Sequence, residues 1–239
     1  MKKLSVVIPC FNEQQTLAQV VAKVGAAGTS GLEMEIVIVD DCSADRSFDI
    51  AKDLAASDPR IQVFRHPVNQ GKGAALRTGF AAASGDLVIV QDADMEYDPA
   101  DYEKLLAPIL AGDADVVYGS RFLERNAIEA HYLIHGLANR FLTGLSNLLT
   151  GLKLTDMETC YKLVPKHLLD HITITENRFG IEPEITAKLA HLKPQPRIQE
   201  VGVSYVNRSY EEGKKIGWKD GVSAIRCILK FNLKRKDKA

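Results

Sequence analysis

The chain has 239 residues, 46% hydrophobic and 26% charged, which is the composition of an ordinary globular protein rather than a disordered or fibrous one. Its length suits one large domain, or one domain with an appendage. The net charge is −1, yet residues 208–239 carry ten Lys or Arg against four Asp or Glu. A basic end suits an anionic membrane surface or a phosphorylated substrate. It is too short and too poor in interleaved aromatic residues to indicate nucleic acid.

No segment predicts export or membrane insertion. The apolar run after Lys2-Lys3 ends at Pro9, which is too short for a signal peptide. Residues 132–152 are the best candidate for a membrane span, but charged and amide side chains interrupt them, and a span needs about 20 apolar residues. The four cysteines form no paired metal spacing, and we expect reduced thiols in a cytosolic protein; they are Cys10, Cys42, Cys160 and Cys227.

Apolar patterning predicts that strands and helices alternate over the first 120 residues. The expected strands are short apolar runs at 4–8, 35–39, 61–65 and 87–90. Helices are expected from Asn12-Glu13, from Asp45 and over 74–83. This alternation predicts a doubly wound, mostly parallel, Rossmann-like α/β sheet with right-handed crossovers, with 61–65 at an edge.

The sharpest local signal is the apolar run Leu87–Val90, which is followed by acidic residues. Four aliphatic residues in a row predict a strand that is buried on both faces. Asp92, Asp94 and Glu96 follow at spacings of two, so in an extended chain their carboxylates would point to the same side. Hard oxygen ligands at the carboxyl end of a strand suit Mg²⁺ or Mn²⁺, which keep positions open for substrate phosphates. The sequence therefore predicts a metal site at these three acids.

Two other local structures would also explain acidic residues at positions 92–103. Asp98-Pro99 can open a helix whose first turn favours acids, but that explains Asp101 better than the acids beside the strand. The three acids and Glu103 also occupy ligand positions of an EF-hand loop, but that loop needs a preceding helix and a Gly where Tyr97 stands. We favour the active-site metal.

Polar groups also follow or precede other predicted elements at the same edge of the sheet. They are Asn12-Glu13, Asp40–Ser43 and Gly71–Gly73. Each has an ordinary explanation as a helix start, a helix cap or a flexible turn, and Gly71–Gly73 is not a P-loop. Because they would converge on the predicted metal, together they favour a nucleotide pocket.

Four segments in this order resemble the successive signatures of family 2 glycosyltransferases, which have a GT-A fold: Val7–Glu13, Val37–Ser43, Asn69–Gly73 and Asp92–Asp94. The resemblance implies a nucleotide-sugar donor bound through Mg²⁺ or Mn²⁺, with Asp92 and Asp94 as the DxD carboxylates. It also implies that further residues contact the nucleotide: Pro9, Phe11 and Glu13 at the base and ribose, Asp40 and Asp41 at the base or ribose, and Lys72 nearby.

The second half resembles the dolichol-phosphate mannosyltransferase branch of that family, whose acceptors are polyprenyl monophosphates. Glu96 stands where that branch completes its metal site, and Gly119–Arg121 matches its GSR element. Asp156–Tyr161 stands where the branch has D-x-x-[SC]-G-[FY], but lacks the Gly. Arg208 followed by Gly213–Lys215 is similar to the branch's Arg and G-x-S-K elements.

A phosphate monoester acceptor is already anionic, so it needs cations that hold and aim it rather than a strong base. The candidate cations are Arg121, Arg140, Arg208, Lys214 and Lys215. Each could instead be a solvated surface charge, although Arg140 interrupts an otherwise apolar helical stretch. The basic amphipathic tail Trp218–Lys236 suits either an anionic membrane surface or a helix docked on the core. Gly180–Glu184 is expected to open a further helix, with one acid as a cap and one facing the acceptor.

These observations predict a GT-A catalytic domain at 1–207, with a nucleotide-sugar half at 1–120 and an acceptor half at 121–207, and a basic, membrane-facing segment at 208–239. The expected activity is metal-dependent, inverting transfer of a hexose from a GDP-mannose- or UDP-glucose-type donor to a dolichyl or undecaprenyl phosphate. The expected catalytic residues are Asp94, Asp156 and Arg121, with Asp156 positioning the sugar or acceptor. A peripheral location on the cytoplasmic face of the membrane is expected, and a homo-oligomer is compatible with the sequence.

Three alternatives stay open at this point. The acceptor could be a hydroxyl of a saccharide or glycolipid, as in cell-surface polysaccharide synthesis, which would require Asp156 or Glu158 as a general base. The chain could be a non-catalytic module that binds a nucleotide sugar or a metal, although the acidic triplet argues against it. It could also be a nucleotidyltransferase, but such enzymes open with a Gly-rich phosphate loop that Pro9–Glu13 does not resemble.

Overall fold

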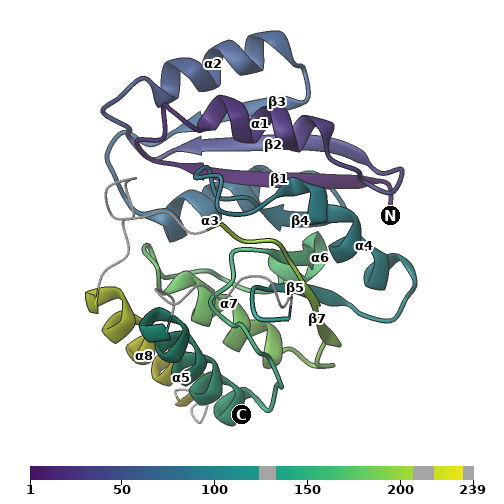
Figure 1. The fold of residues 1–239 in the computed structure, drawn as a ribbon, viewed down its shortest axis with the longest axis vertical. Coiled ribbons are helices and arrows are strands. Elements are labelled where there is room, and N and C mark those ends of the chain that lie inside the picture. The colour runs from purple at the N-terminus through teal and green to yellow at the C-terminus, as the bar shows by residue number, and fades with distance from the viewer. Residues whose placement is uncertain (124–132, 207–217, 234–239) are drawn as a thin grey trace.

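The computed structural model describes residues 1–123, 133–206 and 218–233 (Figure 1). These residues form a seven-stranded sheet in the order β3-β2-β1-β4-β6-β5-β7. The strands are β1 (Lys3–Cys10), β2 (Glu33–Asp40), β3 (Ile61–Arg65), β4 (Leu87–Val90), β5 (Val116–Ser120), β6 (Lys162–Pro165) and β7 (Ile198–Gly202). The helices are α1 (Leu17–Ala26), α2 (Ser47–Ser57), α3 (Lys72–Ala82), the 3₁₀ helix η1 (Pro99–Asp101), α4 (Tyr102–Leu110), α5 (Leu133–Thr150), α6 (Lys166–Asp170), α7 (Ile181–Ala190) and α8 (Trp218–Leu233).

The sheet is mostly parallel, which confirms the predicted α/β class. Strands β3, β2, β1 and β4 pair in parallel, with β3 at the edge as predicted. Strand β6 lies antiparallel between β4 and β5, and β7 pairs in parallel with β5. The insertion of β6 brings residues of the second half of the chain beside β4. Its sequence, Lys162–Pro165, contains only two adjacent aliphatic residues between a Lys and a Pro, so it does not stand out as a strand.

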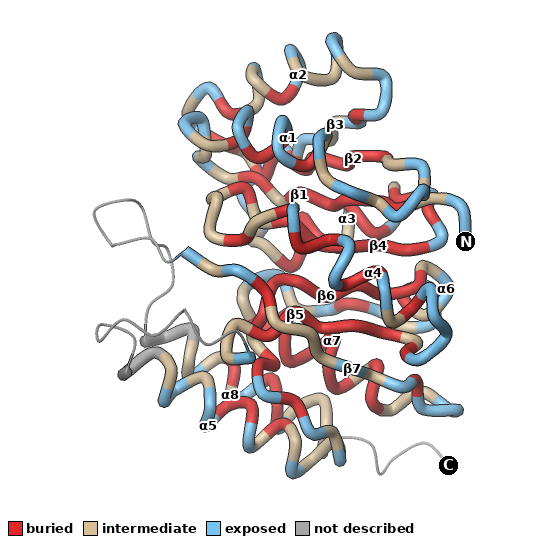
Figure 2. Tube along the Cα trace, turned by 45° about the vertical axis from the view of Figure 1, so that its right-hand side comes forward, coloured by how far each residue is buried: buried red, intermediate tan, exposed pale blue. Residues whose placement is uncertain are grey.

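The core is concentrated in the central strands, which Figure 2 shows as almost continuously buried. All four residues of β4 are buried, as its uninterrupted apolar sequence predicts. Helix α3 packs directly on β1 and β2. Gly79 allows this close approach, because a Cβ atom there would lie 2.2 Å from Cγ1 of Val7.

A buried carboxylate fastens the amino ends of the central strands. Glu35 on β2 accepts hydrogen bonds from the Ser84 backbone N–H at 2.5 Å and the Ser84 hydroxyl at 2.6 Å, and it pairs with Lys3 at 2.5 Å. Burial by itself would raise the pKa of Glu35, but Lys3 and the hydroxyl groups of Ser5 and Ser84 outweigh burial and lower the pKa to about 2. This acid is structural, and it lies at the sheet edge opposite the predicted site.

The helix expected from Asn12-Glu13 begins only at Leu17, so that start was wrong. Asn12 has a positive φ of 54°, which ends the strand in a tight turn. The Asn12 N–H donates to Oγ of Ser43 at 2.9 Å, and its Oδ1 accepts from the Ala44 N–H at 2.8 Å. Asn12 therefore joins the loops that follow β1 and β2 instead of starting a helix.

The helices expected near Pro99, after Gly180 and at the C-terminal end are all present. Asp98 caps η1 by accepting from the Ala100 N–H at 3.2 Å. Helices α5 and α8 lie side by side at the lower left of Figure 1, and α8 also packs on α7. Within the described ranges, no helix combines the length and apolar character that crossing a bilayer requires. The proposed division of the chain at residues 207 and 208 stays a prediction.

Candidate active site

Three loops meet at the carboxyl ends of β1, β2 and β4. The loop after β1 is fastened to the loop after β2 by hydrogen bonds from the Glu13 N–H to Oγ of Ser47, at 2.8 Å, and from the Gln14 N–H to Asp45, at 3.1 Å. The predicted nucleotide contacts Pro9, Phe11 and Glu13 all lie on this loop or at the strand end that leads into it, and each is partly exposed. Their location at the carboxyl edge agrees with the prediction, whereas their contacts with a nucleotide stay a prediction.

Asp40 and Asp41, which were both expected to reach the nucleotide, have different surroundings. Asp41 accepts from the N–H groups of Gly71 at 2.6 Å and Gln70 at 2.9 Å, and it pairs with Nδ1 of His66 at 2.7 Å. Its carboxylate is therefore occupied in holding the 69–71 loop.

Asp40 retains a buried oxygen that can accept a hydrogen bond from a ligand. Oδ2 of Asp40 accepts from the Ser43 N–H at 3.2 Å and lies 3.3 Å from Nε of Arg65. Oδ1 is buried and has no hydrogen-bond partner among the described residues. An unsatisfied buried acceptor costs about 1–3 kcal/mol, which a donor group on a ligand would recover. Asp40 is thus the better candidate for a nucleotide contact.

The Gly71–Gly73 segment is tightly packed rather than a flexible turn. Gly71 has a positive φ of 100°, and a Cβ atom there would lie 2.4 Å from the carbonyl oxygen of Asn177. A Cβ atom on Gly73 would lie 2.3 Å from the carbonyl oxygen of Glu176. The two glycines let the 176–177 backbone cross the start of α3, where the Ala74 N–H donates to Asn177 at 3.2 Å. This contact joins the two halves of the molecule beside Lys72.

The acidic residues after β4 lie on a turn, so the expectation of an extended chain was wrong. Met95 has a positive φ of 66°, and the Glu96 N–H folds back onto Oδ1 of Asp94 at 3.1 Å. Burial, together with the nearby carboxylates of Asp92 and Glu96, raises the pKa of Asp94 to about 7. Glu96 also accepts from the Tyr205 hydroxyl at 2.7 Å. The turn therefore concentrates negative charge at the end of β4.

The donor set at this turn fits a hard divalent cation. Across the described ranges, no three His, Cys, Asp or Glu side chains form a ready-made metal cage. Mg²⁺ does not require one, because it is usually held by one or two carboxylates and completes its shell with water and substrate phosphates. Asp92 and Asp94 offer such oxygens, and the raised pKa of Asp94 reflects burial together with repulsion from neighbouring carboxylates, which a bound cation would offset.

A chain of alternating charges leads from Asp92 into the second half of the molecule. Nζ of Lys72 lies 2.8 Å from Oδ1 of Asp92 and 3.4 Å from Oε1 of Glu182. Oε2 of Glu182 in turn pairs with Nζ of the buried Lys162 at 2.5 Å. Burial opposes the charge on Lys72, but Asp92 and Glu182 raise its pKa well above the usual value. Lys162 was not among the predicted site residues, although a Lys at the start of a short apolar run could have indicated it.

The two acids at the start of α7 have different surroundings, and neither caps the helix; that one of them faces the acceptor stays a prediction. Glu184 is structural, because it accepts from the N–H groups of Thr175 at 2.8 Å and Glu176 at 2.7 Å. Glu182 instead faces Lys72 and Lys162.

Arg121 and Asp156, which were both predicted to be catalytic, form a bidentate ion pair. Nε and Nη2 of Arg121 donate to the two oxygens of Asp156 at 2.7 and 2.8 Å. Oδ1 of Asp156 also accepts from Asn139 at 2.7 Å. Burial would raise the pKa of Asp156, but Arg121 outweighs it and lowers the pKa. With both oxygens occupied by Arg121 and Asn139, Asp156 is placed to position Arg121 rather than to contact a substrate.

Tyr205 connects Arg121 with the acids after β4. The Arg121 guanidinium lies 5.1 Å from the centre of the Tyr205 ring, and the hydroxyl of the same ring donates to Glu96. Among the other predicted acceptor cations, Arg140 is exposed and lies 5.9 Å from the Phe122 ring, and no described contact brings it to Arg121. Three of the predicted cations lie outside the described residues: Arg208, Lys214 and Lys215.

Residues 5–173 match the glycosyl transferase family 2, which is more than half of the chain. The chain belongs to this family. It is 37% identical to a dolichol-phosphate mannosyltransferase of Pyrococcus furiosus, over 53% of this chain and 35% of that protein. It is 28% identical to an undecaprenyl-phosphate 4-deoxy-4-formamido-L-arabinose transferase of Klebsiella pneumoniae, over 90% of this chain and 63% of that protein. The matches therefore span only a third to just under two thirds of these curated relatives.

The fold is that of known GT-A structures, which confirms the expected fold. A glucosyl-3-phosphoglycerate synthase of Mycobacterium tuberculosis, solved with Mn²⁺, uridine diphosphate and phosphoglyceric acid, superposes with a TM-score of 0.71 at 22% identity. The similarity covers 96% of this chain and 78% of that structure.

Glu158 is a further acid in the second half of this family 2 glycosyltransferase. Its Oε1 is buried and has no hydrogen-bond partner among the described residues. Burial and the nearby carboxylate of Glu182 raise the pKa of Glu158 to about 7, although Lys162 and Arg121 act against them. Glu158, unlike Asp156, therefore keeps an oxygen that could accept a proton or a hydrogen bond.

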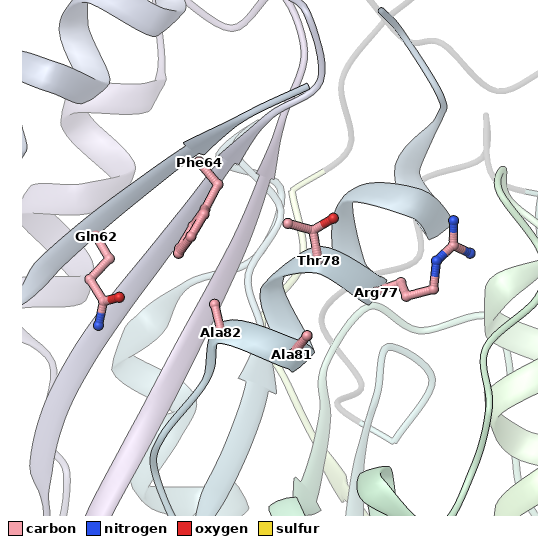
Figure 3. Close-up of a pocket in the computed structure, with 6 residues that line it drawn as sticks. All are labelled: Gln62, Phe64, Arg77, Thr78, Ala81 and Ala82. Carbon is pink, nitrogen blue, oxygen red and sulfur yellow. The ribbon is translucent and has the colours of Figure 1, made fainter. Parts of the chain in front are cut away.

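A surface cavity of the glycosyltransferase lies away from these residues. It has a volume of about 510 Å³ and opens between β3 and α3 (Figure 3). Its lining consists of Gln62, Phe64, Arg77, Thr78, Ala81 and Ala82. It includes none of the predicted site residues and no carboxylate, so it is not the candidate active site.

Proposed function

We propose that the protein transfers a hexose from a GDP-mannose- or UDP-glucose-type donor to a polyprenyl phosphate such as dolichyl or undecaprenyl phosphate. The observation that carries this proposal is the cation Arg121, which is fixed by Asp156 and joined through Tyr205 to the acidic turn after β4. That arrangement supports the proposal, because a cation suited to an acceptor phosphate and carboxylates suited to a donor's metal would then act on the same sugar.

The donor half offers separate groups for the nucleoside and for the diphosphate. Asp40 offers a buried, unsatisfied acceptor to the nucleoside, and Lys72 offers a cation to the diphosphate. Asp92 and Asp94 would hold Mg²⁺ or Mn²⁺, which would neutralise the charge that develops on the departing diphosphate. The M. tuberculosis synthase, crystallised with Mn²⁺ and uridine diphosphate, supports this proposal by analogy of fold.

The acceptor half offers a fixed cation near the place where the sugar would lie. A polyprenyl phosphate is ionised at neutral pH, so Arg121 has only to hold the phosphate and direct one oxygen at the sugar carbon. The new bond joins that oxygen to the sugar carbon, and the bond from this carbon to the diphosphate breaks on the opposite face, which inverts its configuration. The relatives named for dolichol phosphate and undecaprenyl phosphate support this acceptor class.

Helix α5 supports a lipid acceptor because it exposes large apolar side chains on one face, while its other side packs leucines and polar side chains against the core. Asn139 binds Asp156, Thr143 accepts from the Met157 N–H at 3.0 Å, and Asn147 bonds both backbone groups of Leu154. The opposite face exposes Leu137, Phe141 and Leu148 together with Arg140. The neighbouring α8 exposes Val222, Arg226, Leu229 and Leu233. We propose that this α5–α8 face, defined by these exposed residues, rests on the cytoplasmic surface of an anionic membrane.

A donor screen tests the proposal. The purified protein with Mn²⁺ would be given UDP-glucose, UDP-GlcNAc or GDP-mannose, with and without a short polyprenyl phosphate, and nucleotide release would be measured. We expect release from one donor that depends on the lipid and is lost in Asp94→Asn. Release that the lipid does not stimulate, but a saccharide does, would overturn the acceptor assignment while retaining the donor half.

One observation favours a second candidate, in which the acceptor is a sugar hydroxyl. That reaction needs a general base, and a base works best with a pKa near the operating pH. Of the two acids considered, Asp156 is occupied by Arg121, whereas Glu158 has a pKa of about 7 and an oxygen without a described partner. Activity with a saccharide acceptor that disappears in Glu158→Gln would establish this candidate.

A further inference from the structure

The ion pair between Lys72 and Asp92 occupies the carboxylate that the proposed metal needs. Nζ of Lys72 lies 2.8 Å from Oδ1 and 3.0 Å from Oδ2 of Asp92, so one ammonium group covers both oxygens. The two side chains are only 16% and 20% exposed, so solvent screens the pair weakly. A divalent cation at Asp92 and an ammonium at the same oxygens would repel each other. The metal would therefore bind Asp92 more tightly when Lys72 moves away.

Lys72 has another carboxylate within reach when it leaves Asp92. Oε1 of Glu182 is 3.4 Å from its Nζ, while Lys162 holds the other oxygen of Glu182 at 2.5 Å. Lys72 therefore does not have to be buried without a counter-charge during the exchange. The diphosphate of a nucleotide would offer it still stronger, charge-assisted hydrogen bonds.

We propose that Lys72 is a positioning residue that makes the metal and the nucleotide bind together. It holds Asp92 in the metal-free protein and moves to the donor diphosphate when the metal takes its place at Asp92. This inference rests on the proposed metal site at Asp92 and Asp94. Linkage requires that the nucleotide strengthen metal binding by the same factor as the metal strengthens nucleotide binding.

Mn²⁺ titrations monitored by electron paramagnetic resonance test this proposal. The wild type, Lys72→Met and Lys72→Arg would each be titrated alone, with saturating UDP and, in parallel, with GDP, after subtraction of Mn²⁺ binding by the free nucleotide. Without nucleotide, we expect Lys72→Met to bind Mn²⁺ about tenfold more tightly than the wild type. With nucleotide, we expect no such gain, because Lys72 has already left Asp92. Lys72→Arg, which keeps a cation on Asp92, should retain the weak binding.

Two results would overturn the role of Lys72. Unchanged or weaker Mn²⁺ binding by nucleotide-free Lys72→Met would show that the lysine does not compete with the metal. An equal gain with and without nucleotide would show only the general loss of a positive charge. If Lys72→Met does not fold, Lys72→Gln, which keeps a polar side chain, would be titrated with Mn²⁺ in the same way, with and without nucleotide.

Asp94→Asn separates this inference from the metal site on which it rests. Asp94 forms no described ion pair with Lys72, so its substitution removes a proposed metal ligand while leaving the Lys72–Asp92 pair in place. If Asp94→Asn binds Mn²⁺ as the wild type does in the presence of nucleotide, the proposed metal site itself fails. If Asp94→Asn loses Mn²⁺ binding while Lys72→Met shows no gain, the metal site stands and only the competition fails.

Discussion

At the scale of single residues, Asp40 is the predicted nucleotide contact that keeps an unsatisfied carboxylate oxygen. Its Oδ1 is buried without a described partner, although Oδ2 is held by Ser43 and Arg65. We expect Asp40→Asn to weaken UDP or GDP binding by about tenfold to a hundredfold, as the loss of a hydrogen bond to a charged group predicts. Isothermal titration calorimetry of the wild type and the variant would measure this change. Asp58→Asn, at an exposed ion pair with Arg60, is the matched control. Equal nucleotide affinities in all three proteins would contradict the assignment.

Glu158 makes a second prediction at this scale, which concerns stability and pH. Its pKa of about 7 in the folded protein lies above the usual value of 4.5, so the folded state binds a proton more tightly than the unfolded state between these limits. The stabilisation linked to this proton is complete below pH 4.5 and is lost as the pH rises through 7, up to about 3 kcal/mol. Glu158→Gln cannot lose this proton. We therefore expect it to gain stability relative to the wild type between pH 5 and pH 8.

Urea unfolding at several pH values would measure that difference in the free energy of unfolding. Glu33→Gln, at the exposed start of β2, provides the control and should show no comparable trend. A constant difference between Glu158→Gln and the wild type across this range would mean that Glu158 is ionised throughout.

At the scale of elements, the start of α3 depends on glycine because another backbone crosses it. A Cβ atom on Gly73 would lie 2.3 Å from the carbonyl oxygen of Glu176, and neither backbone can move without disturbing the junction between the two halves. We expect Gly73→Ala to lower the free energy of unfolding by about 2–4 kcal/mol, as overpacking does in rigid surroundings. Gly144 is the contrasting control, because it lies on the exposed face of α5 with nothing within 4 Å of its would-be Cβ.

Gly144→Ala should raise the free energy of unfolding by about 0.5–1 kcal/mol, since alanine is the better helix former. Chemical denaturation of both variants would compare them directly. Similar effects of the two substitutions would show that the 176–177 segment yields to Gly73→Ala and is not fixed against α3.

The same elements show how far sequence reasoning reaches. Strands β1, β2 and β4 and the polar residues that follow them could be predicted, because an apolar run and the polar residue that ends it are local signals. The turn at Met95 could not, because a positive φ at a residue other than glycine has no local signature. The roles of Lys162 and Glu182 depend on β6 pairing beside β4, a contact between distant segments. Asp41 looked like a ligand residue because its partners, in the 69–71 loop, lie 29 and 30 residues away in sequence.

At the scale of the whole molecule, charge and apolar surface are both unevenly distributed. Residues 208–239 carry a net charge of +6, which leaves −7 for the remainder of the chain. The exposed apolar side chains of α5 and α8 lie on neighbouring helices, with Leu148 80% exposed and Phe141 61% exposed. A membrane with anionic lipids would attract the basic end and repel the acidic remainder, so it would orient the molecule with the α5–α8 face toward the lipid.

This orientation predicts that the protein binds anionic vesicles through α5. We expect the wild type to sediment with vesicles that contain phosphatidylglycerol, more strongly at low salt, and to bind pure phosphatidylcholine vesicles weakly. Replacing both Phe141 and Leu148 by Glu should weaken binding to the anionic vesicles at least about tenfold, since each side chain buries apolar area in the lipid and each Glu adds repulsion. Leu110→Glu, at the end of α4, introduces the same charge at an exposed leucine outside the α5–α8 face and should bind nearly as the wild type does.

Equal binding by the wild type and the double variant would place the membrane contact elsewhere. Equal binding of the wild type to anionic and to neutral vesicles would contradict the electrostatic attraction, because the basic end would then have no role in docking.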